Sequence, residues 1–529
     1  MAGCADQTSV SEASSTNAWH QDILVPGSSL HTVNGLALDP AGNLLIASLA
    51  SDSIFKFDPQ SKEVSTEIPA QLGRSDDIAL SESGQMYWTD PIAGVVRTRH
   101  DDGTVSVVAD NLPGANSIAF SPDRGRLFVG QTFFADSFWE IDAEGKRPHR
   151  LVAENTGGVN AFAFGTDGMI YGPVAHDGTV VRMDPDSGRT EVVASGLKTP
   201  VSVRWGPGNH LYALAGATGE IIEIDPQTGS TKPVAQVAAP VDNMVITQSG
   251  TIYVTNMADN AVIAVDAATG SATSLIEGEL AFPKDIALAS EEGQDVLYVA
   301  DSTALRRVDT VTGEVTDLAR RMTSALQFPS GIDVSPEHIY LANELTGSVQ
   351  VVDRPTGEFV GTMSELDHPT DVVGLDDGTV LVAEGESGRI VRVDGARRTV
   401  VVEGLAAPTS LVSARNGSVY FAESAAGRIL KLNVDTSSAV EVATDFGAIR
   451  SVDVLPDGRL AVLEASSGDV QVVDPSTGLK KTIAENLPVG YLQDPYPRSG
   501  GMAVGSDGAI YVAADKDNAI LKLTENQSA

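Results

Sequence analysis

Residues 202–229 read SVRWGPGNHLYALAGATGEIIEIDPQTG and carry the pattern that decides the fold. A small polar residue precedes an apolar run, a Gly-containing turn follows, and a second apolar run contains Tyr. After a polar break, a third strand ends in Asp-Pro-x-Thr-Gly. The pattern recurs about twelve times, and from Asp142 to Asp394 its terminal Asp returns at steps of 42, 41, 41, 43, 44 and 41 residues. A period near 40 with four short strands per unit is typical of a β-propeller blade.

Twelve blades are too many for one ring, because propellers usually close with four to eight blades. The sequence therefore predicts an all-β protein of two tandem six-bladed β-propellers with four-stranded antiparallel blades; seven plus five blades is the alternative. We expect a flexible tether over 1–18, a first propeller over 19–279 and a second over 280–529, with the boundary near Glu277–Pro283. Either Ala519–Leu523 or a strand near Gln21–Leu24 is expected to close a sheet.

The net charge of −36 limits the classes of partner. Such a surface repels nucleic acid and anionic lipid, so we exclude both as partners. No run of eighteen apolar residues occurs, so no transmembrane segment is expected. We expect instead a small-molecule substrate or ligand.

Cys4 is the only cysteine, so no intrachain disulfide can form. Its setting, Ala2-Gly3-Cys4, resembles the end of a bacterial lipoprotein signal, in which the cysteine becomes lipidated. This resemblance implies a lipid anchor at Cys4 and a secreted, periplasmic or cell-surface protein whose signal has been removed. The alternative is a chance cysteine in a flexible tail.

The residue just before each inner strand differs between the two halves of the chain. The first half has mainly carboxylates and amides there, whereas the second half has hydroxyls, a glycine and two cations: Lys284, Ser330, Thr370, Thr409, Arg450 and Gly500. Carboxylates that converge on one axis repel one another unless a cation separates them. Oxygen ligands without Cys or dominant His indicate a hard ion, and flexible Asn/Asp sets favour Ca²⁺. The predicted metal ligands are Asn34, Asp76, Asn116, Asn160, Asp242 and Asn243. The alternative interpretation is turn closure, which Asn and Asp also favour.

Other residues near the expected channel mouth are candidates for catalysis and substrate binding. Asp76, Asp242, His31 or His176 could act as the general base, since an imidazole titrates near neutrality. The loop of blade three holds Gln131, Phe133 and Phe134, and its aromatic side chains could form the apolar wall of a pocket. Asp90 and Asn256 end second strands on the same face and complete the predicted substrate-binding set. At the same position, second strands of the second half end in acids: Asp301, Glu384, Glu423 and Glu464. We interpret these acids as turn closers, and a second cation site is the alternative.

Two families share this repeat pattern. The phrases Asn116–Asp123 and Asn34–Leu38 resemble the senescence-marker/gluconolactonase family of calcium-dependent propeller hydrolases, to which paraoxonases are related. The phrases Phe328–Val334 and Tyr298–Asp301 resemble NHL repeats. The first resemblance implies Ca²⁺ ligands at Asn116 and at the Asp242-Asn243 pair. Blade one departs from that family, because residues 31–35, His-Thr-Val-Asn-Gly, stand in place of its Glu-Gly-Pro phrase.

The resemblance implies a metal-assisted hydrolase of a lactone or ester, with its site in the central channel of the first propeller. The ion would polarise the substrate carbonyl and stabilise the oxyanion. Two alternatives stay open. One is an NHL-like binding platform for a small ligand, glycan or protein, and the other is a lyase or isomerase that acts on a small cyclic substrate.

Overall fold

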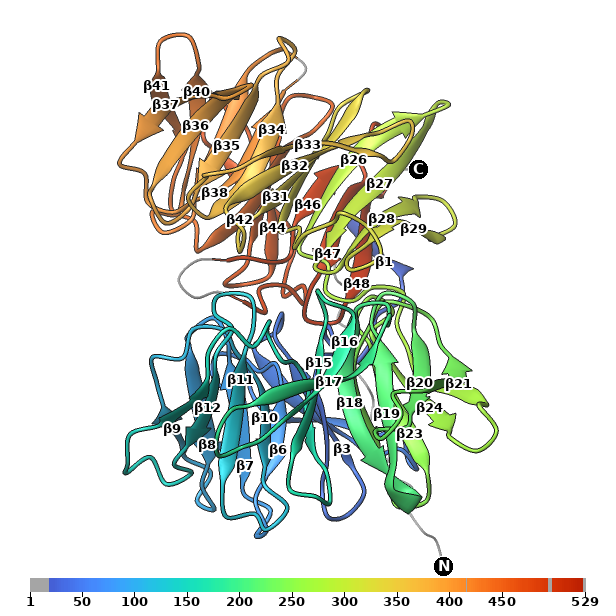
Figure 1. Ribbon diagram of the computed structural model, residues 1–529. Helices are drawn as coiled ribbons and strands as arrows, with labels where there is room; N and C mark the ends of the chain where they lie inside the picture. The colour runs from blue at the N-terminus through green and yellow to red at the C-terminus, as the bar shows by residue number, and fades with distance from the viewer. Residues whose placement is uncertain (1–18, 415, 493–496, 527–529) are drawn as a thin grey trace, which may run out of the picture.

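The computed structural model describes residues 19–414, 416–492 and 497–526. In these ranges, forty-eight strands form twelve four-stranded antiparallel sheets, and the one helical element is the 3-10 turn η1 (Pro207–Asn209). The sheets close into two rings of six, because the inner strand of the sixth blade packs against that of the first, and that of the twelfth against that of the seventh. Figure 1 shows the two propellers in contact. The predicted pair of six-bladed propellers is confirmed.

The first propeller runs from residue 36 to residue 276, and the four strands of each blade follow in chain order from the inner to the outer edge. The strands are β2 (Leu36–Leu38), β3 (Leu44–Ser48), β4 (Ser53–Phe57) and β5 (Val64–Ile68); β6 (Ile78–Leu80), β7 (Met86–Asp90), β8 (Val95–Arg99) and β9 (Val105–Ala109); β10 (Ala115–Phe120), β11 (Leu127–Gln131), β12 (Phe138–Ile141) and β13 (Arg150–Ala153); β14 (Ala163–Phe164), β15 (Ile170–Val174), β16 (Thr179–Met183) and β17 (Thr190–Ser195); β18 (Pro200–Gly206), β19 (His210–Ala215), β20 (Glu220–Ile224) and β21 (Thr231–Gln236); β22 (Val241–Ile246), β23 (Thr251–Asn256), β24 (Ala261–Asp266) and β25 (Ala272–Ile276).

The second propeller follows the same order, except that its last blade takes its outer strand from the N-terminal part of the chain. The strands are β26 (Asp285–Glu291), β27 (Gln294–Asp301), β28 (Ala304–Asp309) and β29 (Val315–Arg320); β30 (Gly331–Val334), β31 (His338–Asn343), β32 (Ser348–Asp353) and β33 (Phe359–Met363); β34 (Pro369–Gly374), β35 (Val380–Glu384), β36 (Arg389–Asp394) and β37 (Arg397–Glu403); β38 (Pro408–Ser413), β39 (Val419–Glu423), β40 (Arg428–Asn433) and β41 (Ser438–Ala443); β42 (Ile449–Val454), β43 (Leu460–Glu464), β44 (Asp469–Val473) and β45 (Lys480–Ala484); β46 (Met502–Val504), β47 (Ile510–Ala514), β48 (Ala519–Glu525) and β1 (Trp19–Val25).

Strand β1 pairs antiparallel with β48, from Trp19 opposite Glu525 to Val25 opposite Ile520. The structure therefore places Trp19–Val25 in the second propeller, and not in the first as the sequence predicted. The first propeller is an insertion between β1 and β26. Its ring closes by side-chain packing, in which Leu36 and Phe55 of the first blade contact Val245 and Val262 of the sixth.

The position of a strand within its blade explains its composition. The second strand of each blade lies between its neighbours and between adjacent blades, so a strand such as β3 is buried along its whole length. The outer strand has one face in solvent, and β17 accordingly shows mostly exposed residues. Tyrosines of the second strands, such as Tyr87 and Tyr171, are buried in the packing between blades.

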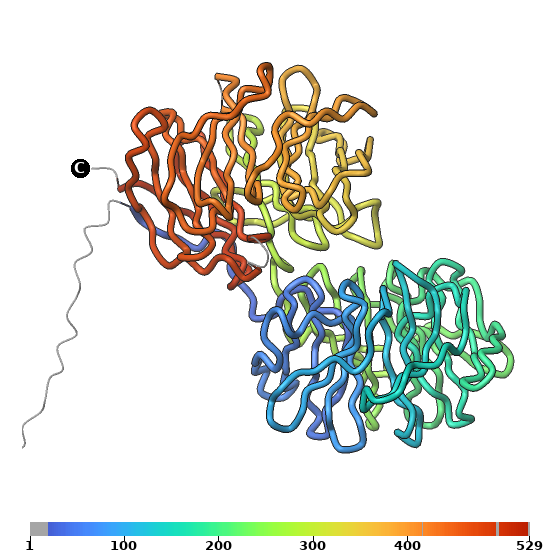
Figure 2. The backbone as a smooth tube through the Cα atoms, turned by 90° about the vertical axis from the view of Figure 1, so that its left-hand side faces the viewer, coloured from blue at the N-terminus to red at the C-terminus, as the bar shows by residue number. Residues whose placement is uncertain are grey.

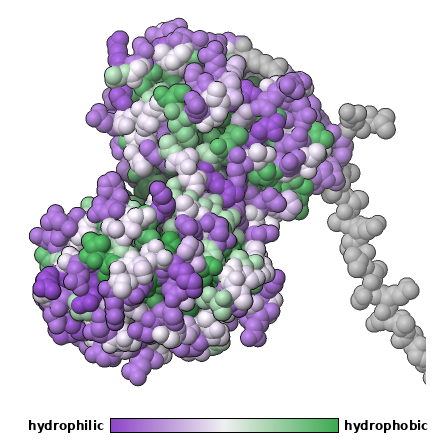
Figure 3. Space-filling view, turned by 45° about the vertical axis from the view of Figure 1, so that its right-hand side comes forward, coloured by the Kyte–Doolittle hydropathy of each residue, from purple (hydrophilic) through white to green (hydrophobic). Residues whose placement is uncertain are grey.

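The two propellers meet through loops next to the beginnings of their inner strands. His31 stacks on Phe55 at 5.8 Å between ring centres and lies 4.7 Å from the Tyr491 ring of the second propeller. The Tyr491 hydroxyl and Ser53 Oγ are 2.8 Å apart. The channel mouths of both propellers therefore lie on the sides that face each other. Figure 2 shows the two rings offset, and Figure 3 shows two mostly hydrophilic lobes that meet at a narrower waist.

No helix in the described ranges is long and apolar enough to span a membrane. The predicted tether over 1–18 and the predicted lipid anchor at Cys4 lie outside the described residues.

Candidate functional site

Cross-blade hydrogen bonds hold the backbone at the channel mouth of the first propeller. Thr255 Oγ1 of the sixth blade donates to the Asn34 carbonyl at 2.6 Å, and Thr89 Oγ1 of the second blade donates to the Asn116 carbonyl. At Gly35, a Cβ would lie 2.1 Å from the Asp76 carbonyl oxygen, so only glycine allows the first two blades to approach this closely. The sequence Asn34-Gly35 thus brings an amide next to a carboxylate.

Asp76 and Asp242 are the two carboxylates at this mouth whose charges interact. Burial raises the pKa of Asp76 well above its usual value, and the nearby charge of Asp242 raises it further. Burial also raises the pKa of Asp242 to about 6, against the lowering effect of Arg321. A buried carboxylate that interacts with a partly buried one favours a bound proton or a bound cation.

The amide of Asn116 provides an independent sign of a missing partner. The side chain is 1% exposed, and its Oδ1 has no hydrogen-bond partner in the described structure. A buried carbonyl oxygen without a partner is costly, and a cation would satisfy it. Asn34 contributes a hydrogen bond to Asp76. Asp76, Asp242, Asn34 and Asn116 therefore form an oxygen-rich set that fits a hard cation.

Two predicted ligands are engaged elsewhere. Asn243 Oδ1 accepts hydrogen bonds from Arg204 Nη2 at 2.9 Å, from the Met244 amide at 2.8 Å and from Ser202 Oγ at 3.1 Å. Asn160 Oδ1 accepts the amide of Ala161 at 2.7 Å. In this geometry Asn243 is part of the hydrogen-bond network below the mouth, and Asn160 closes its own turn.

Amide ligands are necessary for any ion at this mouth. Among the described His, Cys, Asp and Glu side chains, the one group of three with ligand atoms within 4.8 Å of one another is Asp367, His368 and Glu386, on the second propeller. His368 and Glu386 in that group are exposed. The carboxylates of the first channel do not form such a group, so Asn34 and Asn116 would have to complete the coordination there.

The two candidate histidines lie away from the carboxylate pair. His31 is buried between the propellers, where its Nε2 lies 3.1 Å from the carbonyl oxygens of both Asp515 and Lys516. Burial lowers the pKa of His31 to about 4, so its ring is neutral at pH 7. His176 is exposed in the loop that follows β15.

The predicted substrate-binding residues divide into buried and exposed groups. Gln131 accepts the Trp139 indole N–H at 2.6 Å and donates to the Pro113 carbonyl. Asp90 pairs with Arg97 at 3.0 Å, and Asn256 accepts the amides of its own turn. These three side chains hold loops together.

Phe133 and Phe134 differ from the buried three. Their side chains are 67% and 56% exposed, although they follow a buried strand in the loop of blade three. They are available to contact a ligand or a partner.

The residue that follows Asp76 has a structural role that the repeat pattern alone did not reveal. Asp77 accepts the amide of Ile78 at 3.0 Å and that of Ile118, which lies in the next blade, at 3.4 Å. The same bridge from one blade to the next recurs in the second propeller at Asp285 and Asp371. The recurrence of Asp at this position was the available signal.

The channel mouth of the second propeller is filled by protein groups. Arg450 is 2% exposed and donates to the carbonyls of Lys284 at 3.0 Å and Thr409 at 3.2 Å, while Asp285 lies 3.6 Å from its Nη2. Thr370 Oγ1 donates to the Pro408 carbonyl of the next blade at 2.8 Å. The Thr370 hydroxyl therefore joins two blades, and the Arg450 guanidinium fills the channel between the blades that it contacts.

The turn closers of the second propeller agree with the structural interpretation of its acids. Glu384 accepts the amide of Asp367 and pairs with Arg389, and Glu423 does the same with Ala406 and Arg428. Their oxygens are thus occupied by backbone and guanidinium donors.

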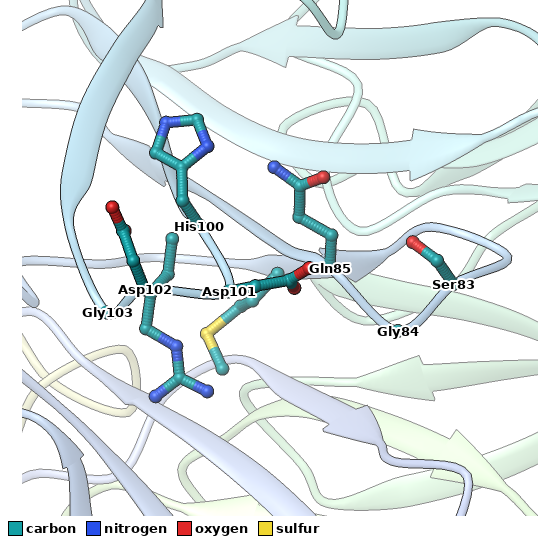
Figure 4. Close-up of a pocket in the computed structure, with 9 residues that line it drawn as sticks. Ser83, Gly84, Gln85, His100, Asp101, Asp102 and Gly103 are labelled. Carbon is teal, nitrogen blue, oxygen red and sulfur yellow. The ribbon is translucent and has the colours of Figure 1, made fainter.

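A surface depression of about 490 Å³ lies at the other end of the second blade (Figure 4). It is lined by the turns 83–86 and 99–103, which include His100, Asp101 and Asp102. The first of these turns follows the inner strand β6, whereas Asp76 precedes it, so the strand separates the depression from the channel mouth. The depression is therefore separate from the carboxylate pair.

The fold and the mouth residues define a tandem β-propeller with one acidic channel mouth and one channel filled by arginine. Residues 8–274, half of the chain, match the family model described as outer membrane protein assembly factor BamB, and the chain belongs to this propeller family. Residues 243–466 match the model described as SMP-30/Gluconolactonase/LRE-like region. The latter match straddles both propellers, so it identifies the repeat without locating a site.

A curated gluconolactonase from Zymomonas mobilis is 26% identical over 144 residues. The match covers 23% of this chain and 40% of that relative, so the chain spans less than half of the relative's length. The predicted resemblance to the SMP-30/gluconolactonase family is confirmed by this match and by the family model. The resemblance to NHL repeats stays a prediction.

Solved structures give weaker similarity. A gluconolactonase from Xanthomonas campestris has 13% identity and a TM-score of 0.38 over 45% of this chain and 86% of its own. The extracellular domain assigned to a one-component system of B. thetaiotaomicron has 11% identity and a TM-score of 0.34 over 96% of this chain and 82% of its own. The architecture accordingly rests on the strand pairing described above.

Proposed function

We propose that this protein is a metal-assisted hydrolase of a lactone or ester, with its site at the channel mouth of the first propeller and Ca²⁺ as the ion. The observations that carry the proposal are the interacting carboxylates of buried Asp76 and partly buried Asp242 and the partnerless Oδ1 of buried Asn116. The gluconolactonase resemblance supports the reaction class.

Each residue of the mouth has a distinct proposed role. Asp76, Asn116 and Asn34 would hold the ion through oxygen atoms, as hard cations require. When bound, the ion supplies Lewis-acid polarisation of the substrate carbonyl. Asp242, whose pKa burial raises to about 6, would accept a proton from the attacking water. His31 is neutral and engaged between the propellers, so it takes no part in this proposal.

Turnover of a panel of lactones and aryl esters tests the proposal. We expect activity that EDTA abolishes and Ca²⁺ restores, and that falls by at least about a hundredfold in Asp76→Asn and Asp242→Asn. Asp101→Asn, which changes a carboxylate in the depression of Figure 4, is the matched control and should leave activity unchanged. Metal-independent turnover, or loss of activity in the control alone, would contradict the site.

The non-catalytic binding platform is the second candidate function. It is favoured by the exposed pair Phe133 and Phe134. It predicts no turnover across the panel and no change in melting temperature on addition of EDTA. A lyase or isomerase would instead consume a cyclic substrate without release of a carboxylic acid, which product analysis distinguishes. The secreted or surface location stays a prediction.

A further inference from the structure

The second propeller inserts a short loop into the mouth of the first. This docking loop is Arg320, Arg321 and Met322, at and directly after the end of β29. Arg320 pairs with Asp259 of the first propeller at 2.6 Å and donates to the Ala239 carbonyl at 2.9 Å. The loop is thus tied to the side of the mouth formed by blades five and six.

Met322 occupies the part of the mouth that lacks an oxygen side chain. Met322 packs at Gly216, which has no side chain. A Cβ placed on Gly216 would lie 2.6 Å from Met322 Cε, 2.7 Å from Val201 Cγ1 and 3.0 Å from the Val241 carbonyl oxygen, so all three groups surround this glycine. Val201 is the apolar member of the ring of residues before the inner strands. An apolar side chain of one propeller therefore packs against the apolar gap in the channel mouth of the other.

Arg321 lies next to this contact, with its guanidinium held in one orientation. The guanidinium carbon is 4.0 Å from the centre of the Phe328 ring, and Nη1 donates to Met257 Sδ at 3.8 Å. Burial lowers the pKa of Arg321, while the charges of Asp242 and Asp76 raise it, so the guanidinium lies near both carboxylates. Among the described residues it forms no ion pair within 4.0 Å.

We propose that Arg321 of the second propeller completes the site of the first and binds the carboxylate group of an acyclic sugar acid, the product of lactone opening. A planar guanidinium held by stacking is suited to two parallel hydrogen bonds with a carboxylate. This inference rests on the proposed function. In that reaction, water adds to the acyl carbon, the ring C–O bond breaks, and the ring oxygen leaves as an alcohol. The acid then loses its proton to solvent at pH 7, and its new negative charge faces Arg321.

The test uses the full chain with Ca²⁺ and two probes that differ in one group, D-gluconate and the neutral polyol D-glucitol. Binding is measured by isothermal titration calorimetry. The wild type should bind gluconate more tightly than glucitol. In Arg321→Gln, gluconate should bind at least about tenfold more weakly with glucitol affinity unchanged, and Arg321→Lys should keep part of the preference. Arg307→Gln, an arginine paired with Glu291 on the same propeller, is the matched control.

Three results would overturn the inference. They are equal gluconate affinity in wild type and Arg321→Gln, equal loss of both probes in that variant, and no gluconate binding by the wild type. Lactone turnover measured in parallel separates the two proposals. If turnover is absent but gluconate binding depends on Arg321, the hydrolase proposal fails and this inference stands. If turnover is present but gluconate binding ignores Arg321, only this inference fails.

Discussion

Replacement of Asp242 by Asn should stabilise the metal-free protein at neutral pH. The pKa of Asp242 in the folded protein is about 6, above its usual 3.8, so the folded state holds the proton more tightly than the unfolded state. The contribution of Asp242 to stability is then greatest below pH 4 and falls as the pH rises through 6. At 1.36 kcal/mol per unit, the full cost is about 3 kcal/mol, and roughly half of it arises between pH 5 and pH 7.5.

Asn has the same shape and no charge, so Asp242→Asn removes this cost. In EDTA at pH 7.5, we expect its melting temperature to exceed that of the wild type by roughly 6 °C, from about 2 °C per kcal/mol for a propeller of this size. At pH 5 the gap should be about half as large. Saturating Ca²⁺ should reverse the order, because the variant lacks the negative charge that Asp242 places near the ion and therefore binds the ion less tightly.

Differential scanning calorimetry measures the melting temperatures of wild type and variant at pH 5 and pH 7.5, each in EDTA and in saturating Ca²⁺. Asp101→Asn, at an exposed turn, controls for the general effect of removing one negative charge. The reasoning is refuted if Asp242→Asn melts below the wild type in EDTA at pH 7.5, or if the gap is the same at both pH values. Either result would mean that the carboxylate is already neutralised by protein groups.

Three further perturbations test other parts of the molecule. Deletion of residues 1–25 should destabilise the second propeller by at least about 2 kcal/mol, because buried Val25 and the pairing with β48 are lost; faster hydrogen exchange confined to β26–β48 would show it. Arg450→Met should cost about 3–5 kcal/mol in urea unfolding, because Asp285 and two carbonyls lose a buried cation, with lactone turnover unchanged. Lowering the pH from 7 to 5 should reduce the free energy of unfolding by about 2 kcal/mol through His31, because its pKa of about 4 in the folded protein lies below the usual 6.5 and the unfolded chain binds the proton first. In His31→Gln, the melting temperature should fall less over the same pH interval.

The repeat predicted most of the fold because each blade is a local unit. The strand spacing and the terminal Asp recur with a period of about forty residues, and the strands of each sheet pair within one such repeat, so the repeat was enough to predict the twelve sheets. The place of β1 was not predictable from the repeat, because its partner β48 lies at the far end of the chain. Its mostly exposed pattern is that of any outer strand.

The candidate site was predictable only in part, for a related reason. Residue position before an inner strand pointed to Asp76 and Asp242, whose charges interact in the structure, and the assignment of Asn116 to the same site stays a prediction. It could not show that Asn243 is engaged by Arg204, since that contact depends on which side chain fills the channel. Arg321 had no sequence signal at all, because it arrives from the docking of one propeller on another.

The strand β1 has a consequence for how the protein is made. It is synthesised before all the other strands described here, whereas its partner β48 follows them all, so one strand edge must wait unpaired while the strands between the two are made. The inserted propeller can form and close meanwhile, since all its blades lie between the two halves of that pair. An early segment that waits this long is open to wrong partners, including the same edge on a neighbouring nascent chain. Slower elongation just before β48, or a chaperone bound to β1, would therefore change the yield of native protein more than either would for a single propeller.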